Sequence, residues 1–467
     1  MQINILCLSL TAAYFALATL SCVAAEADPS ASATLQRSME SYRPIAARLI
    51  ASAQESDAPY RRLAELCDTF GPRITGSTNL ESAIDWILAT LRRDGFTNVR
   101  GEPVSVPHWV RGTESLELLQ PRPHVMRVLG VGGTPPTPVG GVQAEVLVVT
   151  DFAELQKRKA DAAGKIVVFD LPFTDYGVTV AIRTRGAAEA AKAGAVASLI
   201  RSVGSFSMQT PHTGIMDKGN GVPQIPHAAI TSEDAAMLRR MQERGQRLVL
   251  RLKLESVTHP EAISRNIIAE LPGREAPQEV VVVGGHIDSW DVGQGAVDDG
   301  GGCIASWEAL RLVKRLGLQP RRTLRLVLWT GEENGIWGAK AYRKAHWEEL
   351  KNHVLAIESD RGVFAPEGYA FTGSGAALPW IKEIAGMLRP IRADRVTLGN
   401  GGMDVAELIH GGVPVMDLAV DRARYFWYHH SEADTVDKVD SKELNLCIAS
   451  LAVMAFGVAD MPIQLPR

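Results

Sequence analysis

The chain has 467 residues, enough for two or more domains, and 49 basic against 53 acidic residues leave a formal net charge of −4. Apolar residues make up 46% of the sequence, which is an ordinary share for a globular protein. The sequence has no basic stripe or arginine-rich tail, so nucleic acid is excluded as an expected partner.

The first 25 residues, MQINILCLSLTAAYFALATLSCVAA, are apolar and end in a small-residue pattern typical of a cleavage site. A membrane anchor is the alternative, but we favour a cleaved signal peptide over residues 1–25. Residues 26–36 are polar and alanine-rich and predict a disordered or removable leader. We expect no other membrane-spanning stretch. The prediction is therefore a secreted or periplasmic protein that has no membrane contact after signal cleavage.

Residues 37–98 predict helices interrupted by the turn FGPRITGS. From about 120 to 256 the sequence changes to short apolar strands around the small-residue helix RGAAEAAKAG, and RLVLRLKLE alternates like a half-buried strand. This change predicts a smaller α/β domain over 120–256. It would be inserted between two parts of a main domain, 37–119 and 257–467.

From residue 264 onward, strand-like and helix-like segments alternate. The strand-like segments IIAEL, EVVVVGG, RTLRLVLWT and VLAIESD are almost fully apolar. Such strands between helices indicate a mostly parallel, buried sheet flanked by helices. The last helix is predicted to start at Asp440, which forms a capping box with Glu443. Ligands of such sheets bind at the carboxyl ends of the strands.

Three cysteines remain beyond the predicted signal peptide, at Cys67, Cys303 and Cys447. Their number is odd and their spacing shows no pairing, so no disulfide framework is expected. Each is predicted to be a buried, small apolar residue.

The loop GGHIDSWDVGQGAVDDGGG, residues 284–302, follows the strand EVVVV and contains one histidine, four aspartates and many glycines. Gly293 and Gly295 begin a pattern found in phosphate-binding turns. The dinucleotide fingerprint, however, needs a third glycine where this chain has Asp298. A carboxylate there would face a pyrophosphate, so a metal-binding loop is the better interpretation.

Residues that commonly bind metals follow three of the predicted strands, and one more lies in the later segment YFWYHHSEADT. Singly, each pattern is common in surface turns, strand ends or helix starts. Together at one sheet edge they predict a shared site, and imidazole and carboxylate groups suit zinc. The residues are His286, Asp288, Asp298, Glu332, Glu333, Asp360 and His430.

A two-zinc site needs one bridging carboxylate, and Asp298 lies among glycines that allow the backbone to approach closely. Asp288 lies two residues after His286 and can accept the other imidazole N–H. Of the adjacent Glu332 and Glu333, one can bind metal while the other remains free as a base.

Two histidines compete for one ligand position, because His429 is adjacent to His430 and chemistry alone does not decide between them. Seven other histidines are assigned to the surface or the core: His108, His124, His212, His227, His259, His346 and His353.

Five segments carry a family resemblance: GGHIDSWDVGQGAVDDGGG, RTLRLVLWTGEENG, AIESDRGVFAP, FTGSG and YFWYHHSEADT. They resemble the motifs of the co-catalytic zinc exopeptidase family of secreted aminopeptidases, and the likeness covers most of residues 40–460. The resemblance implies the zinc-exopeptidase fold and a protease-associated domain at 120–256. It also implies His430 rather than His429 as ligand, because the family's ligand precedes a pattern seen here from Ser431 to Thr435.

The same resemblance implies a role for each residue. His286 and Asp360 would bind one zinc ion, Glu333 and His430 the other, Asp298 would bridge the two, Glu332 would be the catalytic base, and Asp288 would orient His286.

The predicted function is therefore hydrolysis of short peptides by a di-zinc metallopeptidase. The resemblance narrows the substrates to dipeptides with free termini. A mono-zinc, cyclase-like transferase on the same fold is one alternative, and a non-enzymatic peptide-binding protein is another. The sequence leaves the oligomeric state open, with a homodimer among the expected states.

Overall fold

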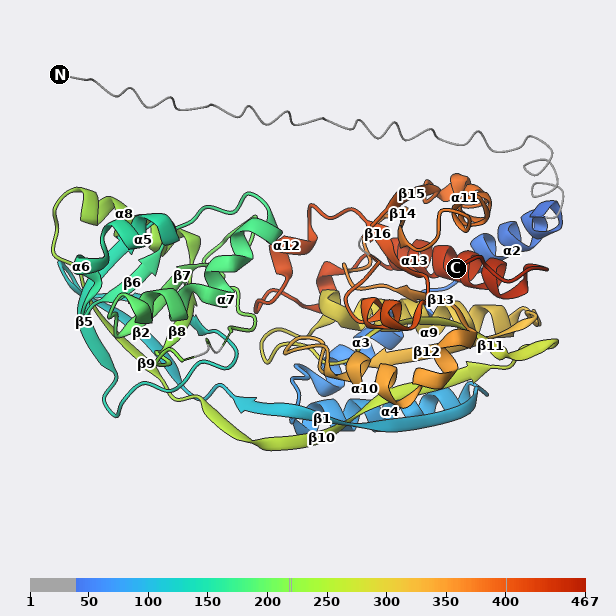
Figure 1. Ribbon diagram of the computed structural model, residues 1–467, viewed down its shortest axis with the longest axis horizontal. Coiled ribbons are helices and arrows are strands. Elements are labelled where there is room, and N and C mark those ends of the chain that lie inside the picture. Colours follow the sequence, from blue (N-terminus) through green and yellow to red (C-terminus); the bar gives the residue numbers. More distant parts are fainter. Residues whose placement is uncertain (1–38, 218, 220, 400) are drawn as a thin grey trace, which may run out of the picture.

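The computed structural model describes residues 39–467 except 218, 220 and 400. The predicted signal peptide and leader therefore lie outside the described residues. The described chain forms two domains that lie side by side, and each has its own sheet (Figure 1). We call them the main domain, which contains the first and last parts of the chain, and the inserted domain.

The main domain is built on an eight-stranded sheet with the order β1-β10-β12-β11-β13-β16-β14-β15. Its strands are β1 (Thr97–Val110), β10 (Val257–Leu271), β11 (Ala276–His286), β12 (Arg322–Trp329), β13 (His353–Glu358), β14 (Pro366–Thr372), β15 (Arg395–Leu398) and β16 (Val415–Val420). Its α-helices are α2 (Arg43–Ala53), α3 (Ala58–Phe70), α4 (Thr78–Arg93), α9 (Gly301–Arg315), α10 (Trp337–Ala345), α11 (Leu378–Gly386), α12 (Tyr425–Tyr428) and α13 (Ser441–Asp460). Its shorter helical turns are η1 (Glu40–Tyr42), η2 (Ala296–Gly300), η3 (Trp347–Asn352), η4 (Arg389–Ile391), η5 (Val405–Gly411) and η6 (Val436–Lys438).

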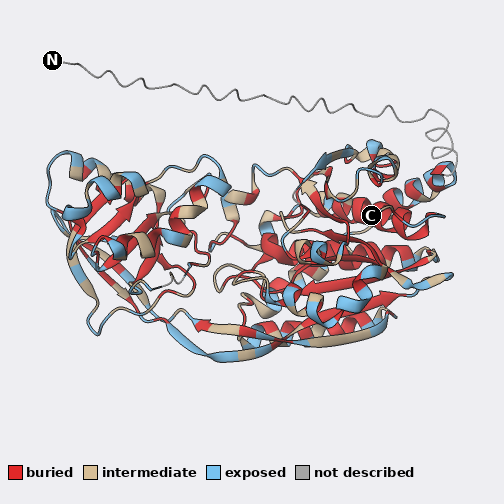
Figure 2. Cartoon of the chain, in the orientation of Figure 1, coloured by how far each residue is buried: buried red, intermediate tan, exposed pale blue. Residues whose placement is uncertain are grey.

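The centre of this sheet is parallel, because β12, β11, β13 and β16 run in one direction. Successive valines of β11 face opposite sides. Val281 and Val283 join the core cluster that includes α9 and α13, while Val280 and Val282 join the cluster that includes α10. Burial on both faces explains why these strands are continuously apolar in sequence. Buried residues are accordingly concentrated on the sheets in both domains (Figure 2).

The final helix, α13, is long and apolar enough to cross a bilayer, which the sequence analysis did not anticipate. In its most apolar window, however, 89% of the residues are buried inside the protein, as in the core helix of a globular domain. Asp440 caps the helix by accepting the N–H groups of Lys442 and Glu443 at 2.8 and 3.1 Å. Glu443 does not complete the predicted capping box, because its carboxylate binds Arg424 instead.

The inserted domain has an eight-stranded sheet with the order β3-β2-β9-β5-β6-β7-β8-β4. Its strands are β2 (Glu114–Gln120), β3 (His124–Met126), β4 (Val128–Gly130), β5 (Val142–Val149), β6 (Ile166–Phe169), β7 (Ala197–Arg201), β8 (His227–Ile230) and β9 (Val249–Leu254). Its helices are α5 (Phe152–Lys157), α6 (Lys159–Ala162), α7 (Tyr176–Lys192) and α8 (Ser232–Glu243).

The structure places the first boundary of the inserted domain earlier than the expected residue 120. Strand β2 pairs with β3 and β9 and therefore belongs to the second sheet. The turn before it contains Gly112, whose φ of +73° suits glycine and redirects the chain out of β1. The inserted domain thus begins near Glu114.

The two domains are joined by the long antiparallel pair β1 and β10, which runs along one side of the molecule (Figure 1). On the facing side, α12 of the main domain lies towards α7 of the inserted domain (Figure 1). Aromatic contacts close this side, with the rings of Tyr176 and Phe426 stacked at 4.9 Å.

The three cysteines, Cys67, Cys303 and Cys447, are buried and free, as predicted.

We expect one buried histidine of the main domain, His353, to make the stability of the fold depend on pH. Arg325 donates to the Tyr342 hydroxyl, which donates at 2.8 Å to Nε2 of His353, and Nδ1–H of His353 donates to the carbonyl of Glu349 at 3.0 Å. These bonds require a neutral ring. Burial, assisted by the charge of Arg325, lowers the pKa of His353 from 6.5 to about 4.

Because the unfolded chain protonates this histidine first, its contribution is complete above pH 6.5 and is lost as the pH falls from 6.5 towards 4. We expect a loss of roughly 3 kcal/mol over that range. Replacing His353 with Gln should flatten the dependence of the urea midpoint on pH, relative to wild type and to a His410→Gln control at an exposed position. Parallel curves for all three proteins would contradict this account.

Candidate metal centre

The carboxyl ends of neighbouring parallel strands bring most of the predicted residues together. His286 is the last residue of β11, Glu332 and Glu333 follow β12, and Asp360 follows β13. His430 comes from the loop after α12 and reaches the same place. The sheet therefore gathers side chains that are up to 144 positions apart in sequence, from 286 to 430.

Asp298 lies at the middle of the cluster, and its two carboxylate oxygens face different groups. Oδ1 lies 3.0 Å from Nε2 of His286, which is also 3.2 Å from Oδ1 of Asp360. Oδ2 lies 3.4 Å from Nε2 of His430, which is 2.9 Å from Oε2 of Glu333. The five side chains thus form two groups that share Asp298.

The neighbouring His429 also approaches this carboxylate, because its Nε2 lies 3.7 Å from Oδ2 of Asp298. Asp298, His429 and His430 can all offer ligand atoms within 4.8 Å of one another. Only His430, however, combines a contact to Asp298 with a close contact to Glu333. The ring of His429 instead packs edge-on against Tyr176 at 5.3 Å.

The cluster concentrates negative charge in a buried place, because His286, Asp298, Glu333 and His430 are each at most 8% exposed. Burial raises the pKa of Glu332 to about 8, with the nearby Asp360 adding to the effect and His286 opposing it. Burial also raises the pKa of Glu333 well above its usual value. Repulsion between unneutralised carboxylates therefore favours the binding of cations here.

Two carboxylate oxygens of the cluster have no hydrogen-bond partner among the described residues. They are Oδ2 of Asp298 and Oε1 of Glu333, and both are buried. Buried polar atoms are rarely left unpaired. Together with the donor set of imidazoles and carboxylates, they fit zinc ions bound at this position.

Asp288 acts on the cluster differently from the prediction. The Nδ1–H of His286 donates to the backbone carbonyl of Asp288 at 3.0 Å, while the carboxylate oxygen Oδ1 is 3.7 Å away. The carboxylate instead accepts the N–H groups of Gly331, Glu332 and Glu333 at 2.8, 3.2 and 3.3 Å. The turn after β12 presents three amide donors, and they attract the carboxylate away from the ring. Asp288 therefore orients His286 through its backbone and the glutamate pair through its side chain.

Two residues that the sequence analysis did not select hold the loop 284–302 in place. Arg73 is fully buried, and its guanidinium donates to the carbonyls of Ile287, Gln294 and Gly295 at 2.7–2.9 Å. Asp434 accepts the N–H groups of residues 296, 297 and 298 at 2.9, 2.6 and 3.1 Å. The pattern from Ser431 to Thr435 contains Asp434 and could have pointed to it, whereas Arg73 lies in an ordinary turn and gave no signal.

The glycines of the loop allow the strand, the loop and helix α9 to meet closely. Asp299 accepts the N–H of His286 at 3.0 Å and that of Gly302 at 3.1 Å. A Cβ on Gly285 would lie 2.2 Å from Oδ2 of Asp299, and one on Gly302 only 1.9 Å from the carbonyl of Ser359. Both positions therefore require glycine.

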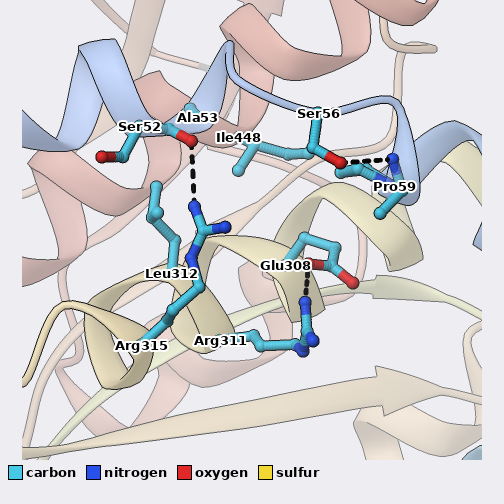
Figure 3. Close-up of a pocket in the computed structure, with 10 residues that line it drawn as sticks. Ser52, Ala53, Ser56, Pro59, Glu308, Arg311, Leu312, Arg315 and Ile448 are labelled. Atoms are coloured by element: carbon cyan, nitrogen blue, oxygen red, sulfur yellow. Dashed lines mark hydrogen bonds and ion pairs between the residues drawn. The ribbon is translucent and has the colours of Figure 1, made fainter.

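A small cavity of about 40 Å³ lies further along α9, at its carboxyl-terminal half (Figure 3). Its charged side chains pair locally. Arg315 donates to the carbonyl of Ser52 at 2.9 Å, and Arg311 donates to Glu308 at 3.2 Å. We regard this cavity as a packing feature, and the candidate site remains the metal centre.

Comparisons with known proteins agree with this geometry. A family model described as peptidase family M28 matches residues 266–455. The chain is 51% identical over 408 residues to carboxypeptidase Q of Bos taurus, and the match covers 87% of this chain and 86% of the relative. It is 50% identical to carboxypeptidase Q of Homo sapiens with the same coverage. The solved structure of a peptidase M28 precursor from Shewanella amazonensis has a TM-score of 0.87 at 35% identity, covering 93% of this chain and 99% of that chain.

The chain belongs to peptidase family M28. It is a zinc metallo-exopeptidase, as the motifs predicted, and the predicted α/β fold with a central parallel sheet is confirmed. Within the family it is similar to carboxypeptidase Q over most of its length. The similarity to these peptidases favours an enzyme over the non-enzymatic peptide-binding alternative.

The role of Asp434 can be tested by Asp434→Asn, which keeps the size of the side chain but replaces one accepting oxygen with an NH₂ group. That group would face a backbone N–H, so residues 296–298 should shift. We expect a loss of about 1–3 kcal/mol of stability and roughly 10-fold or more weaker zinc retention. Thermal unfolding and zinc content after dialysis measure both effects.

The control is Glu432→Gln, at an exposed neighbour whose nearest charged partner is Arg127 at 3.5 Å. Equal zinc retention in both variants would show that Asp434 does not position the loop.

Proposed function

We propose that the protein is an exported di-zinc peptidase that hydrolyses short peptides, principally dipeptides with free termini. The observation that carries the proposal is the position of Asp298, whose two oxygens face two separate groups of ligand-type side chains. A carboxylate in that position is suited to bridge two ions. His286 and Asp360 would hold one zinc ion, and Glu333 and His430 the other.

When bound, the zinc ions supply Lewis-acid polarisation of a carbonyl group and lower the pKa of water. Glu332 is the proposed general base. It takes a proton from the attacking water and gives it to the leaving amine. Burial raises its pKa above the usual value of a glutamate, and this favours a group that both accepts and returns a proton. Asp288 fixes the position of Glu332 by accepting its backbone N–H at 3.2 Å.

The proposed preference for free amino termini follows from the excess of carboxylates around the centre. A protonated or neutral amine can be bound by such groups, whereas an acylated amine offers a weaker donor and no charge. The inserted domain, which we propose to be a protease-associated domain, contacts α12 beside the centre and restricts the space for longer chains. The similarity to carboxypeptidase Q supports peptides as substrates.

The alternative is a mono-zinc, cyclase-like transferase on the same fold. Two observations weigh against it. The side chains of both proposed zinc groups are present and close together, and Glu333 lies 2.9 Å from His430 in the second group. We propose export from the apolar first 25 residues, to the periplasm or the exterior.

Zinc stoichiometry is the first test. Elemental analysis of the dialysed protein should give two zinc ions per chain, and removal of both by a chelator should abolish peptide hydrolysis until zinc is restored. A plateau at one zinc ion per chain with full hydrolytic activity would reject the two-metal proposal.

The second test separates the base from the bridge. Glu332→Gln keeps the side-chain size but removes proton acceptance, so turnover should fall by roughly 10²–10⁴-fold while zinc content stays near that of wild type. Asp298→Asn should instead lower the zinc content itself. The reverse pattern would mean that these roles are exchanged.

The third test concerns the substrate. A digest of matched peptides, followed by mass spectrometry, should show hydrolysis of free dipeptides, weaker cleavage of longer peptides and no cleavage of N-acetylated dipeptides. Equal cleavage of free and acetylated dipeptides would show that the amino terminus is not recognised.

A further inference from the structure

A short segment of the inserted domain lies directly against the loop that carries His430. The N–H of Thr213 donates to the carbonyl of His430 at 2.8 Å, and Nδ1–H of His212 donates to the carbonyl of His429 at 2.6 Å. His212 and Ser431 also form an isolated antiparallel bridge. The two domains therefore meet through backbone contacts at the proposed zinc ligand itself.

This contact supports an uncommon backbone conformation. His430 has a φ of +59°, in the left-handed region that residues with a Cβ seldom occupy. Such a conformation persists when surrounding contacts hold it in place, and it is frequent at functional sites. The hydrogen bond from Thr213 to the carbonyl of His430 is one such contact, and it comes from the other domain.

The imidazole ring of His430 is held by the same residue. Its Nδ1 lies 3.2 Å from the carbonyl oxygen of Thr213, while its Nε2 faces Glu333 at 2.9 Å. A ring that donates Nδ1–H to a carbonyl keeps the lone pair of Nε2 free for a metal. Thr213 thus binds both the backbone and the ring of His430.

Arg183 of α7 completes this arrangement. It is only 4% exposed, and its Nη1 donates to the carbonyl of Thr213 at 3.2 Å. The same Nη1 lies 3.2 Å from Nδ1 of His430, and Nη2 donates to the hydroxyl of Tyr176 at 2.8 Å. The guanidinium therefore fixes the position of the carbonyl that faces Nδ1 of His430.

We propose that Arg183 is a positioning residue for His430, acting through the Thr213 carbonyl, and that the inserted domain thereby completes the second zinc site. This inference rests on the proposed di-zinc function. It adds that zinc affinity depends on a residue of the inserted domain. Because coupling between two equilibria is reciprocal, zinc bound at His430 also holds the inserted domain against the main domain.

The test uses the full-length, zinc-loaded protein with three variants. Arg183→Met removes the charge and keeps a long side chain, Arg183→Lys keeps the charge, and Arg185→Met is the control on the same helix, at an exposed residue that lies over the Phe152 ring. Competition with chelators of graded affinity measures both zinc dissociation constants. Hydrogen exchange reports protection of the Thr213 amide with and without zinc.

We expect Arg183→Met to weaken the binding of one zinc ion by roughly 10–100-fold, which is the range seen when the hydrogen-bond partners of a metal ligand are lost. The other ion should be unaffected. Arg183→Lys should bind that zinc ion more tightly than Arg183→Met but less tightly than wild type. Arg185→Met should have the same zinc dissociation constants as wild type. Zinc should increase protection of the Thr213 amide in wild type but not in Arg183→Met. A merely structural role would lower the melting temperature of stripped and loaded protein equally and leave both dissociation constants unchanged, which would overturn the proposal.

If Arg183→Met does not fold, Arg183→Lys and Tyr176→Phe decide instead, because Tyr176→Phe removes the hydroxyl that holds Nη2. Wild-type zinc affinity in both would overturn the proposal, and weaker binding of one ion would support it. Zinc binding is measured without a substrate, so the outcomes remain distinct. Failure to hydrolyse peptides with zinc bound would reject only the proposed function, and failure to bind zinc would reject both.

Discussion

The accumulation of buried carboxylates at one edge of the main sheet is the constraint on which the site depends. Removing a charge from water is costly unless it is paired. The chain meets this cost in two ways. Asp288, Asp299 and Asp434 each accept two or three backbone N–H groups and act as anchors for loops. Asp298 and Glu333 instead each keep a buried oxygen that has no hydrogen-bond partner among the described residues, and both face imidazole rings. The first group is satisfied by the protein, and the second fits bound cations.

The same division explains why the loops around the centre are so closely constrained. An anchoring carboxylate works only if several N–H groups point at it, so the backbone of residues 284–302 must follow one particular path. Arg73 fixes the carbonyls on that path, and the amides on it point to Asp434. Glycine at 285 and 302 then leaves room for Asp299 between the strand and helix α9. The backbone path of this loop and its glycines at 285 and 302 thus both follow from the need to pair buried carboxylates with backbone N–H groups.

The central parallel sheet and the members of the cluster were predictable, because continuously apolar strands and residues at their carboxyl ends are local sequence features. Arg73 was not predictable, since a buried arginine in a turn looks like an exposed one until the carbonyls it binds are known. The role of Asp288 was assigned to the wrong part of the residue, because spacing identifies a neighbour but does not tell whether its carbonyl or its carboxylate makes the bond. The early start of the inserted domain at β2 was missed because β1 and β2 are separated by only a short turn.

The contact between the domains extends this reasoning beyond the sheet. The other four proposed ligands come from the sheet and loops of the main domain, whereas His430 lies in a left-handed backbone conformation at the boundary. Its carbonyl accepts the N–H of Thr213, and its Nδ1–H donates to the Thr213 carbonyl. A domain that merely covered a cleft could contact α12 through aromatic side chains alone, as Tyr176 and Phe426 do. Backbone bonding to the ligand loop adds a geometric requirement, because a small displacement of Thr213 would rotate the imidazole. In our proposal, the position of the inserted domain therefore helps to set the direction of the lone pair on Nε2 of His430.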